Sequence, residues 1–158
     1  MESAATPPIL ILGIGNILMR DDGVGVRALE ALRQVPLPDT VELLDGGTFG
    51  ADLLDEIANR RKVIVLDAMA TGAAPGTVLR LAGEELWQEQ DSLSLHEFGL
   101  VETLKMARQL GCAPAAVVVF GVQPQEIALN LTLSPAVAAA IPHLIERVLA
   151  EIKVGDTT

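Results

Sequence analysis

Acidic residues stand just beyond the ends of three predicted strands, where a parallel sheet would bring them together. Asp21 and Asp22 follow the first apolar run, Asp45 ends the second, and Asp67 ends the third. The carboxyl ends of parallel strands share one edge of a sheet, and ligands bind beyond that edge, so we expect these carboxylates to gather there. The pattern predicts a cation-binding site at this edge.

A histidine completes the candidate cation site. His96 is expected at the second position of a helix, because Ser94 and Glu97 form a capping-box pattern. The positive end of the helix dipole disfavours a protonated imidazole, and the neutral imidazole is the form that binds metals. A set of Asp22, Asp67 and His96 suits nickel, zinc, manganese or iron better than calcium.

Each of these residues also has a structural interpretation that the sequence leaves open. Asp21 or Asp22 would serve as the N-cap of the first helix, and Asp45 as a turn residue before two glycines. His96 would fit a solvated position in the first turn of its helix. Asp67 is the strongest functional candidate, because it follows four apolar residues in a neighbourhood where a charge is costly.

Alternating apolar runs and amphipathic segments position these residues. Buried strands are predicted at 8–13, 41–44, 62–66 and 116–121, a less buried strand at 77–81, and helices at 23–34, 51–59, 94–110 and 134–152. Ser134 is predicted to cap the last helix. This order predicts the α/β class, with a single three-layer domain in which a mostly parallel, twisted five-stranded sheet lies between helices. The domain is expected to span residues 1–158, with flexible ends at 1–7 and 154–158.

Composition narrows the possible functions. The net charge of −10 opposes binding to the phosphate backbone of nucleic acids. The single cysteine, Cys112, excludes an internal disulfide and a multi-cysteine zinc cluster. No stretch approaches the ~20 apolar residues of a membrane span, and the first residues do not have the pattern of a secretory signal. We therefore expect a cytoplasmic protein with no membrane partner.

The glycine-rich loop after the first strand permits two interpretations. Gly13, Gly15 and Asn16 invite comparison with a dinucleotide-binding loop, but the third glycine of that fingerprint would fall at Leu18. The preferred interpretation is a tight backbone turn beside the site, with the Asn16 side chain bracing the loop. A nucleotide-binding or regulatory module stays the main alternative, and a zinc metallohydrolase acting on a small molecule is a third possibility.

Six short segments carry a family resemblance. They are residues 12–18 (LGIGNIL), 21–26 (DDGVGV), 44–48 (LDGGT), 65–68 (VLDA), 95–100 (LHEFGL) and 121–124 (GVQP). In this order and spacing the chain resembles the hydrogenase maturation endopeptidases, the nickel-dependent proteases that process the large subunits of [NiFe]-hydrogenases. Many members of that family have glutamate where this chain has Asp22, and the shorter side chain changes the reach of the carboxylate.

The resemblance implies a function for each part of the site. The protein would be an aspartic-type endopeptidase that removes the C-terminal extension of a nickel-loaded large-subunit precursor and uses the nickel of that substrate for recognition. The implied metal-binding and catalytic residues are Asp22, Asp67 and His96. The implied substrate-recognition residues are Asp45, Gly46, Gly47 and Thr48. The precursor is then the expected partner of a monomeric enzyme that holds no tightly bound cofactor of its own.

Overall fold

The computed structural model describes residues 6–47, 53–83, 85–86 and 99–154. The strands are β1 (Ile9–Ile14), β2 (Val41–Gly47), β3 (Lys62–Ala68), β4 (Val78–Ala82) and β5 (Ala116–Val122). The helices are the 3-10 helix η1 (Arg20–Gly23), α1 (Val24–Leu32), α2 (Leu54–Ile57), α4 (Leu100–Gln109) and α5 (Pro135–Lys153). The predicted order of strands and helices is confirmed.

The strands form one sheet in the order β2-β1-β3-β5-β4. The pairs β1–β2, β1–β3 and β3–β5 are parallel, whereas β4 runs antiparallel to β5 at the edge of the sheet. This arrangement confirms the α/β class and the mostly parallel, five-stranded sheet. The sheet crosses from β1 to β3 and then to β5, so β1 and β3 are neighbours although β2 lies between them in the chain.

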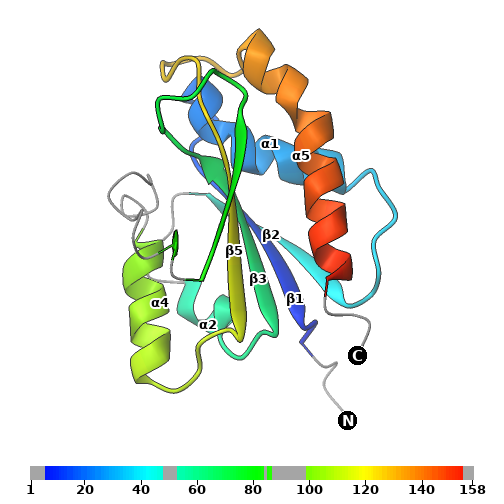
Figure 1. Cartoon of the computed structure of the whole chain (residues 1–158), viewed down its shortest axis with the longest axis vertical. Coiled ribbons are helices and arrows are strands. Elements are labelled where there is room, and N and C mark those ends of the chain that lie inside the picture. Colours follow the sequence, from blue (N-terminus) through cyan, green and yellow to red (C-terminus); the bar gives the residue numbers. More distant parts are fainter. Residues whose placement is uncertain (1–5, 48–52, 84, 87–98, 155–158) are drawn as a thin grey trace.

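Helices cover both faces of the sheet (Figure 1). Helices α1 and α5 pack on one face and α2 and α4 on the other. Each face has its own core of Val, Leu, Ile and Ala side chains, with Phe120 the largest fully buried residue. Strands β1 and β3 are buried on both sides, as their continuous apolar sequences predict.

Helix α1 lies so close to the sheet that backbone touches backbone. A Cβ atom on Gly25 would lie 2.0 Å from the carbonyl oxygen of Leu66 and 2.7 Å from that of Ile14. A Cβ atom on Gly13 would in turn lie 2.6 Å from the carbonyl oxygen of Gly25. These glycines allow α1 to sit directly above the ends of β1 and β3, which fixes the loop before α1 near the end of β3.

The structure tests the starts of two predicted helices in part. The helix predicted at 94–110 does not run unbroken: α4 begins at Leu100, and Gly99 before it has a φ of 70°, which no α-helical residue adopts. The capping box of Ser94 and Glu97 lies outside the described residues. Ser134 does stand at the N-cap of α5, but its side chain makes no capping hydrogen bond.

Among the described helices, none combines the length and the hydropathy that a membrane crossing requires.

The close approach of α1 leads to a test of stability. Gly25→Ala should lower the free energy of unfolding by about 3 kcal/mol, because the added methyl group would overlap a backbone oxygen that has little room to move. Urea unfolding followed by circular dichroism measures the change. Glu30→Ala, at an exposed position of the same helix, should shift the free energy by less than about 0.5 kcal/mol. Equal effects in the two variants would contradict this account.

Candidate active site

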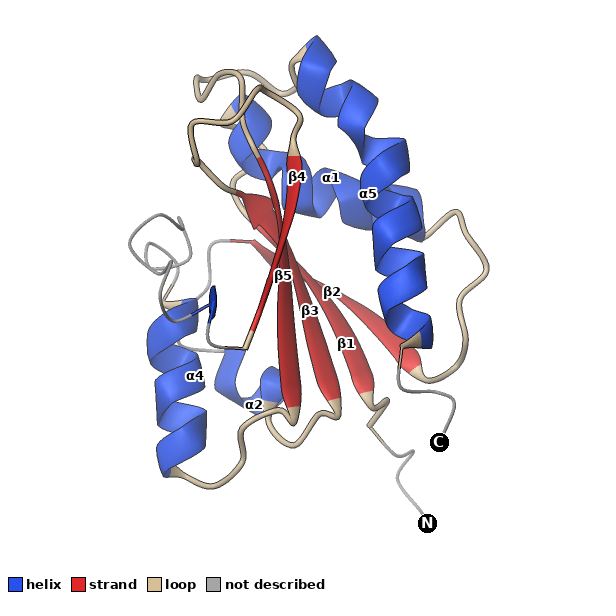
Figure 2. Ribbon diagram, viewed as in Figure 1, coloured by secondary structure: helices blue, strands red, loops and turns tan. Residues whose placement is uncertain are grey.

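The ends of β1, β2 and β3 lie next to one another at the carboxyl edge of the sheet. Gly13 of β1 is opposite both Asp45 of β2 and Leu66 of β3. Asp67 follows directly after that pair, and η1, which carries Asp22, also contacts β3. Figure 2 shows the loops that follow β3 and β5 at this same end of the molecule. The fold thus brings three of the predicted acidic positions to one edge.

Asp22 turns toward the loop that follows β1. Its Oδ2 accepts a hydrogen bond of 2.9 Å from the N–H of Asn16, and Asn16 Oδ1 accepts one of 2.9 Å from the N–H of Leu18. Helix α1 has Gly23 at its N-cap, so the alternative in which Asp21 or Asp22 caps this helix is wrong. Asp22 Oδ1 accepts no hydrogen bond from the described residues.

Gly15 lets this loop close around Asp22. Its φ of 128° favours glycine, and its N–H donates a hydrogen bond of 2.9 Å to the carbonyl oxygen of Gly47. A Cβ atom at Gly15 would lie 2.0 Å from the carbonyl oxygen of Asp22. The loop therefore serves close contact between backbones, with Gly15 joining the end of β2 to the loop that carries Asp22.

Asp67 is a buried carboxylate at the end of β3. Its side chain is 2 % exposed, and its Oδ1 accepts a hydrogen bond of 2.8 Å from the N–H of Ala68. Gly121 of β5 lies opposite it in the sheet. Burying a carboxylate is costly unless hydrogen bonds or charges compensate for the lost water. Among the predicted ligands within the described residues, Asp67 has the environment most typical of a functional group.

The predicted recognition segment belongs to the last part of β2. Asp45 is exposed, and its Oδ1 accepts a hydrogen bond of 2.8 Å from the N–H of Gly47. Gly46 is buried, and a Cβ atom there would lie 2.8 Å from a methyl carbon of Leu12. The strand extends through Gly47, so Asp45 lies within β2, but the alternative of a turn residue is borne out in part, because Gly47 has a positive φ of 49° and donates its N–H to the Asp45 side chain. Thr48 lies outside the described residues.

The three-ligand site stays a prediction. His96, the third predicted ligand, lies outside the described residues. Within the described parts of the chain, no three side chains of His, Cys, Asp or Glu stand close enough together to hold a metal ion. Asp22 and Asp67 supply two carboxylates at this edge, and any third ligand must come from elsewhere.

Asp21 has a structural role that the sequence did not reveal. It is fully buried, and its Oδ2 accepts hydrogen bonds of 2.9 Å from the N–H groups of Gln125 and Glu126. The N–H of Ser134 donates to Oδ1 at 2.8 Å, and the Ser134 hydroxyl donates to Oδ2 at 2.7 Å. One carboxylate thus holds both ends of the segment between β5 and α5, which explains why the Ser134 hydroxyl does not cap its helix.

The charge of Asp21 is stabilised by these donors. Burial by itself raises the pKa of Asp21, but the hydrogen bonds from Ser134, Glu126 and Gln125 lower this pKa by more than burial raises it. The net pKa therefore lies below the ordinary value of 3.8. The folded protein therefore favours the ionised carboxylate. Its contribution to stability is present above the pKa of the unfolded chain and is lost as the pH falls through the pKa of the folded state.

Gln123 joins the loops that follow β3 and β5. Its Oε1 accepts a hydrogen bond of 2.7 Å from the N–H of Thr71, and the Thr71 hydroxyl and the Gly72 N–H also donate to it at 3.2 Å. The N–H of Gly76 donates to the Gln123 carbonyl oxygen at 2.8 Å. The loop after Asp67 is thereby fastened to the end of β5. Gln123 belongs to the 121–124 segment (GVQP), but a partner 52 residues away leaves no local pattern that would reveal this role.

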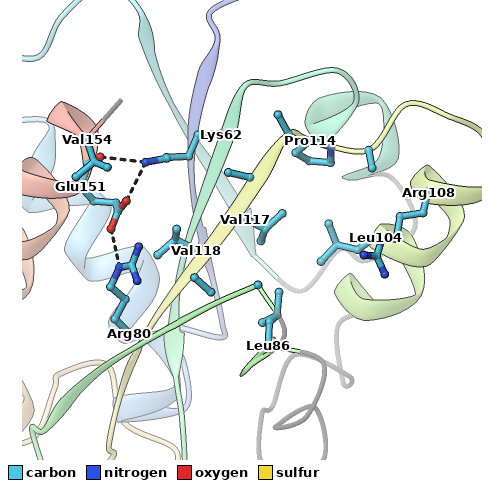
Figure 3. A pocket seen from close by; sticks show the side chains of 15 residues that line it. Lys62, Arg80, Leu86, Leu104, Arg108, Pro114, Val117, Val118, Glu151 and Val154 are labelled. Atoms are coloured by element: carbon cyan, nitrogen blue, oxygen red, sulfur yellow. Dashed lines mark hydrogen bonds and ion pairs between the residues drawn. The ribbon is translucent and has the colours of Figure 1, made fainter. Parts of the chain in front are cut away.

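A separate cavity of about 370 Å³ lies at the opposite end of the sheet (Figure 3). Leu104 and Arg108 of α4 line one side of it. On the other side, Glu151 of α5 binds Lys62 at 2.8 Å and Arg80 at 2.7 Å. Burial raises the pKa of Glu151, but the hydrogen bonds from Arg80 and Lys62 lower it more, so the net pKa is reduced. These ion pairs fasten the end of α5 to β3 and β4, which is a structural role.

The fold and the sheet edge define a class of protein. This is an α/β protein in which acidic side chains and tightly turned loops gather where parallel strands end, the usual position of a ligand site in such folds.

Comparison with known proteins identifies the family. The family model described as hydrogenase maturation protease matches residues 26–151. The hydrogenase 2 maturation protease of Escherichia coli K12 is 42% identical over 148 residues, which cover 92% of this chain and 90% of that protein. A hydrogenase expression/formation protein, HupM, of Azotobacter chroococcum is 38% identical and covers 98% of this chain and 80% of its own length.

Solved structures agree with this match. The hydrogenase maturating endopeptidase HybD from Escherichia coli has a TM-score of 0.86 at 42% identity, covering 92% of this chain and 91% of that one. The [NiFe] hydrogenase maturation protease HybD from Thermococcus kodakarensis has a TM-score of 0.76 at 28% identity, covering 90% and 97%. The chain therefore belongs to the hydrogenase maturation protease family, and its general role is that of a peptidase in hydrogenase maturation.

The hydrogen bonds of Asp21 lead to a test by mutation and pH. Asp21→Asn should lower the free energy of unfolding at pH 7 by about 3 kcal/mol, because an amide group cannot accept all four donors. The stability difference between wild type and variant should shrink as the pH falls below the ordinary aspartate value, since the unfolded wild-type chain then binds a proton that the native carboxylate, with its lowered pKa, does not yet take up. Denaturant unfolding between pH 3 and pH 8 measures both effects. A difference that does not change with pH would contradict the assigned charge.

Proposed function

We propose that this protein removes the C-terminal extension of the precursor of a [NiFe]-hydrogenase large subunit, and that it cleaves only the nickel-loaded precursor. Membership of the maturation protease family supports the peptidase activity. The observation that carries the site assignment is that η1, which carries Asp22, contacts β3, which carries the buried Asp67, at the carboxyl edge of the sheet. Nickel belongs to the substrate in this proposal, and the enzyme holds no tightly bound cofactor of its own.

The carboxylates provide a physical basis for recognising nickel. Asp22 keeps one oxygen on the Asn16 N–H, which fixes the side chain and leaves the other oxygen for the metal. Asp67 is held in a position from which water is largely excluded, where its attraction to a cation is stronger than in bulk water. Together with His96, predicted from the sequence, they form an incomplete set of ligands. A precursor without nickel would offer no cation to join them.

Cleavage requires an attacking water and a group that removes its proton. We propose that nickel positions the scissile peptide bond and that a carboxylate of this site acts as the general base. The water oxygen then bonds to the carbonyl carbon, its proton goes to the carboxylate, and the peptide C–N bond breaks. The proton passes to the leaving amine, which becomes the N-terminus of the released tail.

The other parts of the proposal follow from the predicted site. The segment that recognises the substrate is Asp45, Gly46, Gly47 and Thr48. Its support is position: Asp45 lies opposite Gly13 near the end of β1, and Gly46 follows directly. The partner is the large-subunit precursor, which the monomeric enzyme meets in the cytoplasm.

Substitution of the predicted ligands tests the assignment. Asp67→Asn and His96→Ala should each lower the rate of tail removal at least about 100-fold, because the loss of one ligand weakens the metal contact that positions the bond. Intact-mass spectrometry of a nickel-loaded precursor follows the cleavage. Asp39→Asn, at an exposed position before β2, is the matched control and should cleave at the wild-type rate.

Circular dichroism and thermal unfolding show whether each variant has kept its fold. Wild-type cleavage by a folded His96→Ala or Asp67→Asn enzyme would remove that residue from the site.

A further inference from the structure

Four large apolar side chains are exposed in two segments beside the candidate site. They are Leu18, Ile127, Leu129 and Leu131, with exposed fractions of 50%, 49%, 83% and 60%. We call them the apolar rim. A single exposed leucine is common on protein surfaces, but a group of them on adjoining segments is typical of an interaction surface.

The two segments of the rim are joined by backbone hydrogen bonds. The N–H of Asn130 donates to the carbonyl oxygen of Leu18 at 2.9 Å, and the N–H of Arg20 donates to the carbonyl oxygen of Asn130 at 2.9 Å. Met19 and Asn130 form a parallel bridge between the same segments. Leu18 and the neighbours of Asn130 therefore belong to one surface.

The rim is also held firmly to the rest of the fold. The Nη2 atom of Arg27 donates a hydrogen bond of 2.6 Å to the carbonyl oxygen of Leu131, which joins the rim to α1. The Asp21 carboxylate binds the N–H groups on both sides of the 127–131 segment. In Figure 1 this segment lies next to η1 at the end of the sheet where the site is. A prearranged apolar surface loses little conformational entropy when a partner binds.

The rim is continuous with the candidate site. Leu18 donates its N–H to Asn16, and the N–H of Asn16 binds Asp22. A substrate chain whose scissile peptide bond lies at Asp22 would therefore place the residues next to that bond over the rim. Other exposed apolar residues do not share this position: Leu110 follows α4 and Val154 follows α5, both at the opposite end of the sheet.

Charges around the rim indicate what kind of segment fits. Arg27 is paired with Glu30 at 3.2 Å, and Arg20 lies 3.6 Å from Glu126. The nearby cations are therefore balanced by carboxylates, and Asp22 adds negative charge. The whole chain carries a net charge of −10. An apolar segment flanked by Lys or Arg complements such a surface better than an acidic one.

We propose that the apolar rim is the docking surface for an apolar, basic-flanked segment of the substrate precursor close to the cleaved bond. This inference rests on the proposed function, since it takes the precursor as the occupant. The rim contributes equally to binding of the precursor in the ground state and in the transition state. Asp22 and Asp67 act at the scissile peptide bond.

The double variant Leu129→Ser/Leu131→Ser tests the docking surface. Its KM for the nickel-loaded precursor should rise at least about tenfold, because two apolar side chains lose their burial on binding, while kcat stays within about twofold of wild type. Leu110→Ser, which replaces an equally exposed leucine at the other end of the sheet, should leave both constants unchanged. An unchanged KM in a folded double variant, or a fall in kcat alone, would overturn the proposal.

A binding measurement separates this inference from the proposed function. The immobilised precursor is titrated with the wild-type enzyme and with the double variant. We expect the double variant to bind more weakly than the wild type. Absence of cleavage by wild type combined with this loss of binding would reject the proposed function and retain the docking surface. Equal binding would reject the docking surface. A second copy of this chain is the other possible occupant of the rim, and sedimentation of the enzyme without precursor tests for it. If the wild type is a dimer and the double variant is a monomer, the rim binds a second copy and the proposal is overturned.

Discussion

The buried carboxylate of Asp21 is the interaction on which the candidate site and its surroundings depend. It joins η1 to the segment before α5 through four hydrogen bonds, and the pKa of its carboxyl group is lowered as a result. Its neighbour Asp22 takes the opposite direction and binds the loop after β1. Two adjacent aspartates thus have separate tasks: one fixes the framework, and the other presents an oxygen at the carboxyl edge of the sheet.

Glycine makes this arrangement possible, because the elements that carry the site approach one another at backbone distance. Gly25 lets α1 rest on the ends of β1 and β3, and Gly15 lets the loop pass over Asp22. Any side chain at these positions would push η1 away from β3 and separate Asp22 from Asp67. Gly13 and Gly15, which suggest a dinucleotide-binding loop in the sequence, serve close packing between backbones in the structure.

The sequence predicted what depends on local pattern and missed what depends on distant partners. Apolar runs revealed the buried strands, and their alternation with amphipathic segments revealed the parallel sheet, so the carboxyl edge and its acidic residues followed. The role of Asp21 was missed because its partner Ser134 is 113 residues away. The interruption of the predicted helix 94–110 at Gly99 was missed, because the capping pattern at Ser94 gives no sign of the positive φ at that glycine. The position of His96 is outside the described residues, so that part of the site rests on the sequence and the resemblance.

The central claim is that the acidic sheet edge engages nickel held by the precursor. The most direct measurement compares tail removal by mass spectrometry for the same purified precursor with and without nickel, at equal enzyme concentration. The expected result is cleavage of the nickel-loaded precursor and no cleavage of the nickel-free form. Asp67→Asn should cleave neither form. Equal cleavage of both forms by the wild-type enzyme would contradict the central claim, since the carboxylates would then act without the cation that they are proposed to recognise.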